Sequence, residues 1–246
     1  MLNNETISKL NEMHMGTMAS GFAAQLADSQ FQNLSFEERF SILVDAEWSS
    51  RKSNRLAKLI KKGGYSDSEA AIEDIDFNPG RKLDKAQILR LASCSYIKQA
   101  QNVIILGATG TGKTYLACAF GMAANRNFYE VKYMRLPDLL VEIAIARGSG
   151  TYREVMKKYR KVRLLILDEW LLYSLKESEV RDLLELIEAR NKVSSTIFCS
   201  QFDVSEWHAS LYDPTMADAI CDRIVCNSHT VKIEGDSMRR KAAIAE

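Results

Sequence analysis

The sequence predicts an α/β protein in which a parallel sheet lies between two layers of helices and a small all-helical segment precedes it. Three observations lead to this prediction. From residue 76 onward, short apolar strand patterns alternate with helical patterns, as in parallel sheets covered on both faces. A glycine-rich loop stands between the first strand and the next helix. Residues 1–75 show helical patterns only, so we expect a helical N-terminal domain over 1–75 and a second domain over 76–246.

Length and composition are those of a globular protein. The 246 residues are 46% hydrophobic and 26% charged, which is ordinary for a folded soluble chain. The five cysteines form no CxxC pair, which argues against a disulfide framework or a zinc site and fits a reducing compartment. The chain starts without a secretion-signal pattern, and no apolar run reaches the roughly 18 residues of a membrane span. We therefore expect a cytoplasmic protein.

The helical segment contains one long helix with recognisable ends. Ser35 and Glu38 have the spacing of a capping box, and apolar residues follow at helical intervals. Gly63 and Gly64 then predict the end of this helix near residue 62.

Two basic blocks stand out in a chain whose net charge is only +1. Residues 51–62 contain six basic residues and no acidic residue, and residues 147–163 contain seven basic residues and one acidic residue. Four side chains of the first block would share one face of the long helix, namely Arg51, Arg55, Lys58 and Lys62. Such blocks can bind a polyanion locally or can simply be solvated helix faces, and charge alone does not choose between them.

The second domain reads as alternating elements. Strands are expected at residues 102–106, 129–134, 164–167, 195–200 and 230–233. Helices are expected at residues 114–124, from Pro137, from a capping box of Ser174 and Glu177 to about Arg190, and at residues 214–224.

The loop after the first strand predicts a nucleotide site. It matches G-x-x-x-x-G-K-T at every fixed position, and the flanking strand and helix make a chance match improbable. Backbone N–H groups of such a loop cradle phosphates, while the lysine bridges the β- and γ-phosphates and the threonine hydroxyl ligates Mg²⁺. The expected nucleotide-binding residues are Gly107, Ala108, Thr109, Gly110, Thr111, Gly112, Lys113, Thr114 and Tyr115.

Two acids follow the buried strand at residues 164–167. Asp168 emerges at the carboxyl end of this strand, where ligands of parallel sheets bind, and is expected to hold Mg²⁺ together with Thr114. Glu169 is the better candidate for the general base on the attacking water.

Three further polar residues are candidates for the phosphate site. Gln201 follows the strand at residues 195–200 and could position the water, with Ser200 close behind. Arg223 and Arg239 could stabilise charge on the γ-phosphate, although the residues alone favour surface salt bridges at both positions.

These motifs together resemble the IstB-like ATP-binding family, relatives of the DnaC-type helicase loaders within the AAA+ proteins. The resemblance covers nearly the whole chain. Its most specific parts are the N-terminal Leu34-Ser35-Phe36-Glu37-Glu38-Arg39 and the C-terminal Gly235-Asp236-Ser237-Met238-Arg239. It implies an AAA+ P-loop core, ATP with Mg²⁺, homo-oligomers with ATP at subunit interfaces, assembly on duplex DNA and a transposase partner.

The resemblance also implies roles for individual residues. Gln201 matches the sensor of the γ-phosphate, Arg223 the arginine finger that acts across a subunit interface, and Arg239 the second sensor. One position departs from the family pattern, because Leu171 stands where a glycine is expected. The segment around residues 77–100 is the expected source of adenine contacts.

The second basic block gains weight from the same resemblance, since this part of AAA+ proteins often faces nucleic acid. We expect a mobile loop at residues 147–150 and phosphate contacts that do not depend on base sequence. The candidate DNA contacts here are Arg147, Arg153, Lys157 and Lys158.

The leading hypothesis is an ATPase that assembles on DNA, recruits and stimulates a transposase, and is released by hydrolysis. The main alternative is a replicative helicase loader, which shares the core and differs in the partner of residues 1–75. A P-loop kinase of small molecules is disfavoured because the Asp168-Glu169 pair suits activation of water. A scaffold with a vestigial site is disfavoured because every fixed residue of the site is present.

Overall fold

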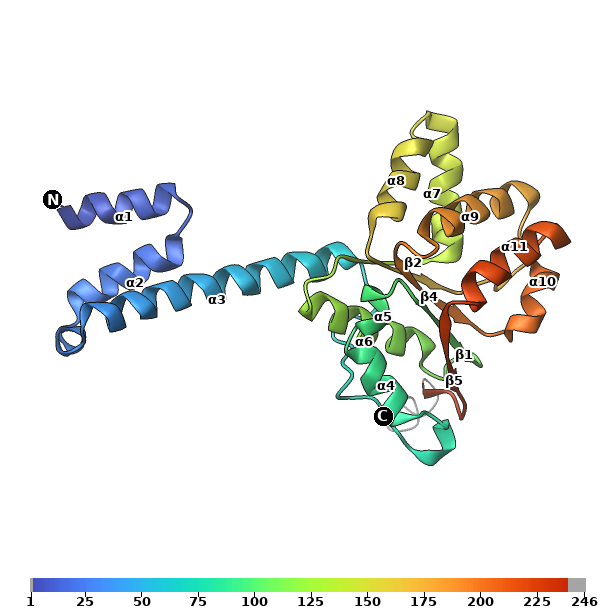
Figure 1. Cartoon of the computed structure of the whole chain (residues 1–246), viewed down its shortest axis with the longest axis horizontal. Helices are drawn as coiled ribbons and strands as arrows, with labels where there is room; N and C mark the ends of the chain where they lie inside the picture. Colours follow the sequence, from blue (N-terminus) through green and yellow to red (C-terminus); the bar gives the residue numbers. More distant parts are fainter. Residues whose placement is uncertain (1, 239–246) are drawn as a thin grey trace. The chain divides into compact units, whose positions relative to one another are not determined.

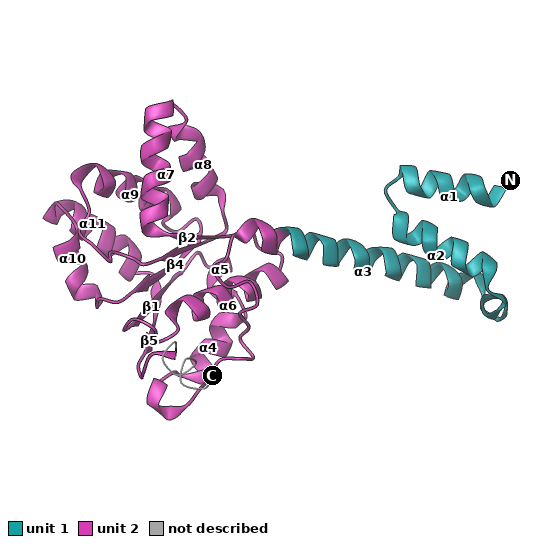
Figure 2. Ribbon diagram, turned by 180° about the vertical axis from the view of Figure 1, so that it is seen from behind, with its two compact units in different colours: residues 1–58 teal, residues 59–246 magenta. Residues whose placement is uncertain are grey.

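The chain divides into two compact units. The computed structural model describes residues 2–238, and the units comprise residues 1–58 and residues 59–246 (Figure 2). The division falls before the boundary expected near residue 75. Ala70, Ile72 and Ile75 are buried in the core of the second unit, and the acidic, polar composition around them hid this from the sequence.

The first unit consists of helices. Its elements are α1 (Leu2–Glu12), α2 (Gly16–Ala27), the 3₁₀ turn η1 (Ser29–Asn33) and the larger part of α3 (Phe36–Gly63). The predicted capping box is confirmed, because Glu38 N–H donates to Ser35 Oγ at 3.2 Å and Ser35 N–H donates to Glu38 Oε2 at 2.8 Å. The predicted end of α3 is confirmed as well, and Gly64 follows it with a left-handed φ of 67°.

The second unit is built around a five-stranded parallel sheet in the order β2-β3-β4-β1-β5 (Figure 1). The predicted strands are all present, as β1 (Asn102–Gly107), β2 (Val131–Arg135), β3 (Leu164–Asp168), β4 (Ser195–Ser200) and β5 (Ser228–Ile233). The α-helices are α4 (Lys85–Ala92), α5 (Ser95–Lys98), α6 (Lys113–Arg126), α7 (Leu136–Ser149), α8 (Tyr152–Lys161), α9 (Glu177–Arg190), α10 (Trp207–Ser210) and α11 (Pro214–Val225). Short 3₁₀ turns are η2 (Pro79–Arg81) and η3 (Val204–Glu206).

Two apolar layers enclose the sheet, with α4, α5 and α6 on one face and α7 to α11 on the other (Figure 1). Strand residues alternate between these layers, as strand geometry requires. In β3, Leu164 and Ile166 face the first layer, and Leu165 and Leu167 face the second. All four are fully buried, which explains why this strand reads as a continuous apolar run.

Two local predictions are wrong. Helix α9 begins at Glu177 and not after a capping box of Ser174 and Glu177. Lys176 precedes the helix, and its N–H donates to Glu179 Oε2 at 2.7 Å. The expected mobile loop at residues 147–150 is instead the end of α7, which Gly150 terminates with a left-handed φ of 76°. None of the helices described has the length and apolar character that crossing a bilayer requires.

Candidate nucleotide site

The glycine-rich loop joins β1 to the first turn of α6, and its glycines are required by its surroundings. Gly110 and Gly112 have left-handed φ values of 83° and 98°, which L-residues rarely adopt. A Cβ atom at Gly107 would lie 2.5 Å from the Ile233 carbonyl oxygen, and one at Gly110 would lie 2.3 Å from Ser237 Oγ. The backbone of the loop therefore has a fixed conformation, and β5 and the segment after it approach this backbone too closely for side chains at these glycines.

Lys113 is buried and curls back over this loop. Its ammonium group donates to the carbonyl oxygens of Gly107 at 2.7 Å and of Ala108 at 2.9 Å. The first turn of α6 also directs the positive end of its helix dipole toward the loop. The predicted phosphate-binding residues are thus brought together at one place.

Thr114 and Asp168 meet across the carboxyl edge of the sheet. Thr114 Oγ1 donates to Asp168 Oδ2 at 2.7 Å. Asp168 is 5% exposed, and the N–H of Glu169 donates to its other oxygen, Oδ1, at 2.8 Å. A hydroxyl and a carboxylate are the oxygen ligands that Mg²⁺ prefers, so this pair fits the metal site expected from the sequence.

Glu169 follows Asp168 with a left-handed φ of 55°. A non-glycine residue in this region costs about 1–2 kcal/mol, and such strain clusters at functional sites. The carboxylate forms an ion pair with Arg135, whose Nη2 lies 2.9 Å from Glu169 Oε2. Arg135 is the last residue of β2 and pairs in register with Asp168. Hydrogen bonding and charge from Glu169 raise the pKa of Arg135, with a smaller contribution from Asp138.

Gln201 and Ser200 have different surroundings. The Gln201 amide oxygen accepts from Thr109 Oγ1 of the glycine-rich loop at 2.7 Å. Ser200 is buried, and its hydroxyl donates to the Trp170 carbonyl oxygen at 3.2 Å and accepts from Trp207 Nε1 at 3.2 Å. Gln201 therefore faces the phosphate site, and Ser200 holds the loop after the acids.

The departure from the family pattern at Leu171 has a backbone explanation. Leu171 has a left-handed φ of 52°, the conformation that glycine adopts without cost. Its side chain is fully buried beside Trp170. Trp170 in turn packs edge-on against Phe198 and Trp207, with ring centroids 4.6 and 5.6 Å apart. Packing therefore holds a leucine in a conformation that favours glycine.

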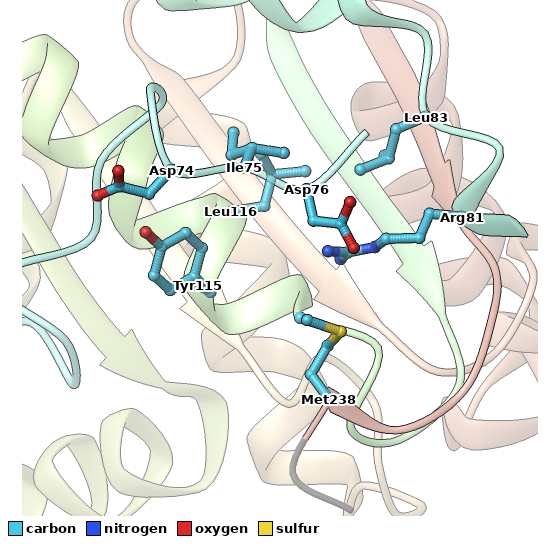
Figure 3. A pocket seen from close by; sticks show the side chains of 9 residues that line it. Asp74, Ile75, Asp76, Arg81, Leu83, Tyr115, Leu116 and Met238 are labelled. Carbon is cyan, nitrogen blue, oxygen red and sulfur yellow. The ribbon is translucent and has the colours of Figure 1, made fainter. Parts of the chain in front are cut away.

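A mostly apolar cavity of about 270 Å³ lies beside the glycine-rich loop (Figure 3). Arg81 and Leu83 come from the segment expected to contact adenine, while Asp74 to Asp76 precede it. The cavity is lined by Asp74, Ile75, Asp76, Arg81, Leu83, Gly112, Tyr115, Leu116 and Met238. A mostly apolar lining with a few polar groups is typical of small-molecule sites.

Arg81 and Met238 tie three segments together at this cavity. Arg81 Nη2 donates to the Thr111 carbonyl oxygen at 2.7 Å, and the Arg81 carbonyl accepts from Glu234 N–H at 3.1 Å. Met238 N–H donates to the Gly110 carbonyl at 2.9 Å. Arg81 lies in the segment expected to contact adenine and Met238 in the C-terminal segment that carries the resemblance, but no pattern in the sequence assigns either side chain a role at the site. The expected second sensor, Arg239, lies outside the described residues.

Arg223 lies away from the phosphate loop of its own chain. It is in the last turn of α11, donates to the Ala219 carbonyl at 2.8 Å and forms an ion pair with Glu188 at 2.7 Å. The chain then reaches Asn227, whose carbonyl accepts from Asn102 N–H at the start of β1. Arg223 is thus near the amino edge of the sheet, whereas Lys113 follows the carboxyl end of β1.

Several of the candidate DNA contacts are paired with acids. Arg147 forms an ion pair with Asp182, Lys158 with Glu142, Lys62 with Glu130 and Arg51 with Glu47. Burial alone would raise the pKa of Glu142. Hydrogen bonds from Lys158 and Tyr159 outweigh this effect and hold that pKa below its ordinary value. Arg153 and Lys157 are exposed on α8, and Arg55 and Lys58 are exposed on α3.

Comparisons with known proteins agree with this geometry. A family model described as IstB-like ATP binding protein matches residues 8–245. Over 240 residues, the chain is 39% identical to a Sinorhizobium fredii protein described as an insertion sequence ATP-binding protein, and the match covers 98% of both.

Two solved structures resemble the chain in fold. DnaA from Aquifex aeolicus, solved with AMPPCP, has a TM-score of 0.59 and 23% identity, over 72% of this chain and 54% of the DnaA chain. The DnaC helicase loader has a TM-score of 0.58 and 16% identity, over 67% of this chain and 97% of the other.

Proposed function

The chain belongs to the IstB-like ATP-binding family, and on that premise we propose that it is an ATP-hydrolysing regulator of insertion-sequence transposition. Its second unit has the AAA+ P-loop fold. In the proposed cycle, ATP holds subunits together on duplex DNA. The assembly recruits and stimulates a transposase, and hydrolysis releases it.

The contact between Thr114 and Asp168 is the observation that carries this proposal. A hydroxyl and a buried carboxylate meet at 2.7 Å beside Lys113 and a second acid, which is the arrangement that ATP hydrolysis requires. Bound there, Mg²⁺ would neutralise charge that develops on the phosphates. Lys113 would bind the β- and γ-phosphates, Gln201 would orient water, and Glu169 would accept its proton.

The cavity beside the loop would hold the adenine of the nucleotide. Its walls combine apolar side chains with Tyr115 and the Arg81 guanidinium, which bonds to the loop itself at Thr111. Because Met238 lines this cavity and also bonds to Gly110 of the loop, the base and the phosphates would contact one connected set of residues. The family match supports ATP as the nucleotide.

Interaction with DNA is supported by exposed basic side chains on α8 and α3. Arg153, Lys157, Arg55 and Lys58 are exposed, and contacts of such residues to phosphates are salt-dependent and insensitive to sequence. The cations that form ion pairs, such as Arg147 with Asp182, would have to exchange partners to contact phosphates.

The position of Arg223 supports assembly through neighbouring subunits. It lies near the amino edge of the sheet and is held by Glu188 at 2.7 Å, so it cannot reach the γ-phosphate bound by its own Lys113. An arginine of this kind acts on the nucleotide of an adjacent subunit.

The test compares nucleoprotein assembly by the full chain and by Lys113→Ala. Electron microscopy with duplex DNA should show ATP-dependent particles for the unaltered chain and none for the variant. Mg²⁺ and ADP serve as the control condition. Identical particles from Lys113→Ala, or particles that form equally well without ATP, would refute the proposed cycle.

A helicase loader is the second candidate, favoured by the likeness to the DnaC structure. The two candidates differ in the protein partner. The full chain with ATP should retain a transposase of an insertion sequence and not a replicative helicase. Retention of the helicase alone would favour the loader.

A further inference from the structure

The buried phenol of Tyr133 contacts the carboxylate on which the proposed metal site depends. Tyr133 lies in the middle of β2 and is 7% exposed. Its hydroxyl donates to Asp168 Oδ2 at 2.8 Å, the same oxygen that accepts from Thr114 at 2.7 Å. With Glu169 N–H on the other oxygen, both oxygens of Asp168 are held by hydrogen bonds.

Tyr133 remains a neutral donor at any pH near neutrality. Burial raises the pKa of its phenol, a hydrogen bond with the Ser66 side chain offsets part of this rise, and the Asp168 carboxylate raises the pKa further. A protonated phenol can orient a carboxylate by donating to it but is a poor metal ligand itself. The group therefore suits positioning of Asp168 and not direct ligation.

A second phenol of this region offers a comparison because it does not contact Asp168. Tyr65, on the segment after α3, donates its hydroxyl to Asn125 Oδ1 on α6 at 2.6 Å. Its ring occupies the space that a side chain at Gly121 would need, since a Cβ there would lie 2.5 Å from Tyr65 Cε1.

We propose that Tyr133 is a positioning residue for Asp168 and thereby sets how strongly the nucleotide site binds Mg²⁺. The inference rests on the proposed function, because it requires Asp168 to be a metal ligand. Groups that orient a metal ligand commonly change metal affinity by about 10- to 100-fold when removed.

The test measures binding of a fluorescent ATP analogue to the full chain, with Mg²⁺ titrated and with EDTA. Tyr133→Phe keeps the ring and removes the donor. We expect the half-saturating Mg²⁺ concentration to rise about 10-fold, with nucleotide affinity in EDTA unchanged. Tyr65→Phe is the matched control, because it also removes a phenol hydroxyl from this region, but one that binds Asn125. Its Mg²⁺ dependence should equal that of the unaltered chain.

Two outcomes would overturn the inference. They are an unchanged Mg²⁺ requirement in Tyr133→Phe and an equal shift in Tyr65→Phe. If the unaltered chain binds the analogue without any dependence on Mg²⁺, the proposed function itself fails. Dependence in the unaltered chain together with no change in the variants removes only this inference.

Discussion

The two units bury their apolar residues to very different extents. Among the described residues of 1–58, only Ala19 and Leu43 are buried hydrophobic residues. Phe36 is 68% exposed and Trp48 is 61% exposed. The second unit encloses apolar layers on both faces of its sheet, in which strands such as β3 are fully buried.

This difference shows which part of the chain has a complete core. A small helical unit cannot bury enough surface by itself, and residues 1–58 leave an apolar groove of about 590 Å³ between α1, α2 and α3. The second unit buries apolar residues on both faces of its sheet and exposes a polar site. Within the proposed function, the first unit is where the partner contact belongs and the second is where the chemistry belongs.

The largest expected effect separates these roles. Glu169→Gln should lower ATP hydrolysis about 1,000-fold, because removal of a general base typically costs 10²- to 10⁴-fold. Binding of ATP and of the partner should persist. Phosphate release and a transposase pull-down, run on the same preparation, measure both. Loss of partner binding along with hydrolysis would show that the units do not divide the function.

Core substitutions should affect the two units unequally. Phe198→Ala removes a fully buried ring of the second unit and should lower the free energy of unfolding by about 3–5 kcal/mol. Phe36→Ala, at an exposed position, should change it by about 0.5 kcal/mol or less. Denaturant titration followed by circular dichroism measures both. Equal losses would mean that the first unit has a core of its own at Phe36.

A smaller effect is expected at Arg135, which pairs with the proposed base. Arg135→Ala frees the Glu169 carboxylate to accept a proton and should raise hydrolysis in the absence of DNA about 3-fold, the scale of a partly exposed ion pair. Arg135→Lys retains the charge and serves as the control. Steady-state phosphate release measures both, and slower turnover in Arg135→Ala would show that the ion pair assists catalysis.

The smallest effect is expected from thiol labelling, which tests how well the second unit buries its cysteines. Cys94, Cys118, Cys199 and Cys221 are buried, and Cys226 is exposed. Burial raises the pKa of Cys94 to about 11, and a hydrogen bond with Asp222 raises the pKa of Cys226. Because thiolates react and thiols do not, maleimide should label Cys226 alone, slowly at pH 7 and faster as the pH rises. Mass spectrometry counts the labels, and a second fast site would indicate local opening.

Much of the second unit could be predicted from the sequence because its signals are local. The apolar run at Leu164–Leu167 and the loop at Gly107–Thr114 combine pattern with spacing, and parallel pairing then brings their ends to one edge. The long helix was predictable for the same reason, since the Ser35–Glu38 box and Gly63 mark its two ends.

The rest depends on contacts between distant segments. Tyr133 is a buried residue that alternates along β2 with the half-buried Lys132 and Met134, like any core residue, and only the pairing with β3 reveals that its hydroxyl reaches Asp168. The cavity required the segment at Asp74–Asp76 and the turn at Met238 to meet. The sequence does not show that Asp182 of α9 lies beside Arg147 and pairs with it. It also does not show that three side chains within the acidic segment before residue 76 are buried. These features have no short-range signature.

The hydrogen bond from Met238 to the glycine-rich loop has a practical consequence at the bench. Residues 234–238 contact Gly110 and Arg81, so an affinity handle inserted directly after residue 238 would lie beside the proposed nucleotide site. Purification tags and fluorescent reporters are better inserted elsewhere in the chain. Nucleotide affinities measured on protein with such an insertion should be compared with those of the unaltered chain.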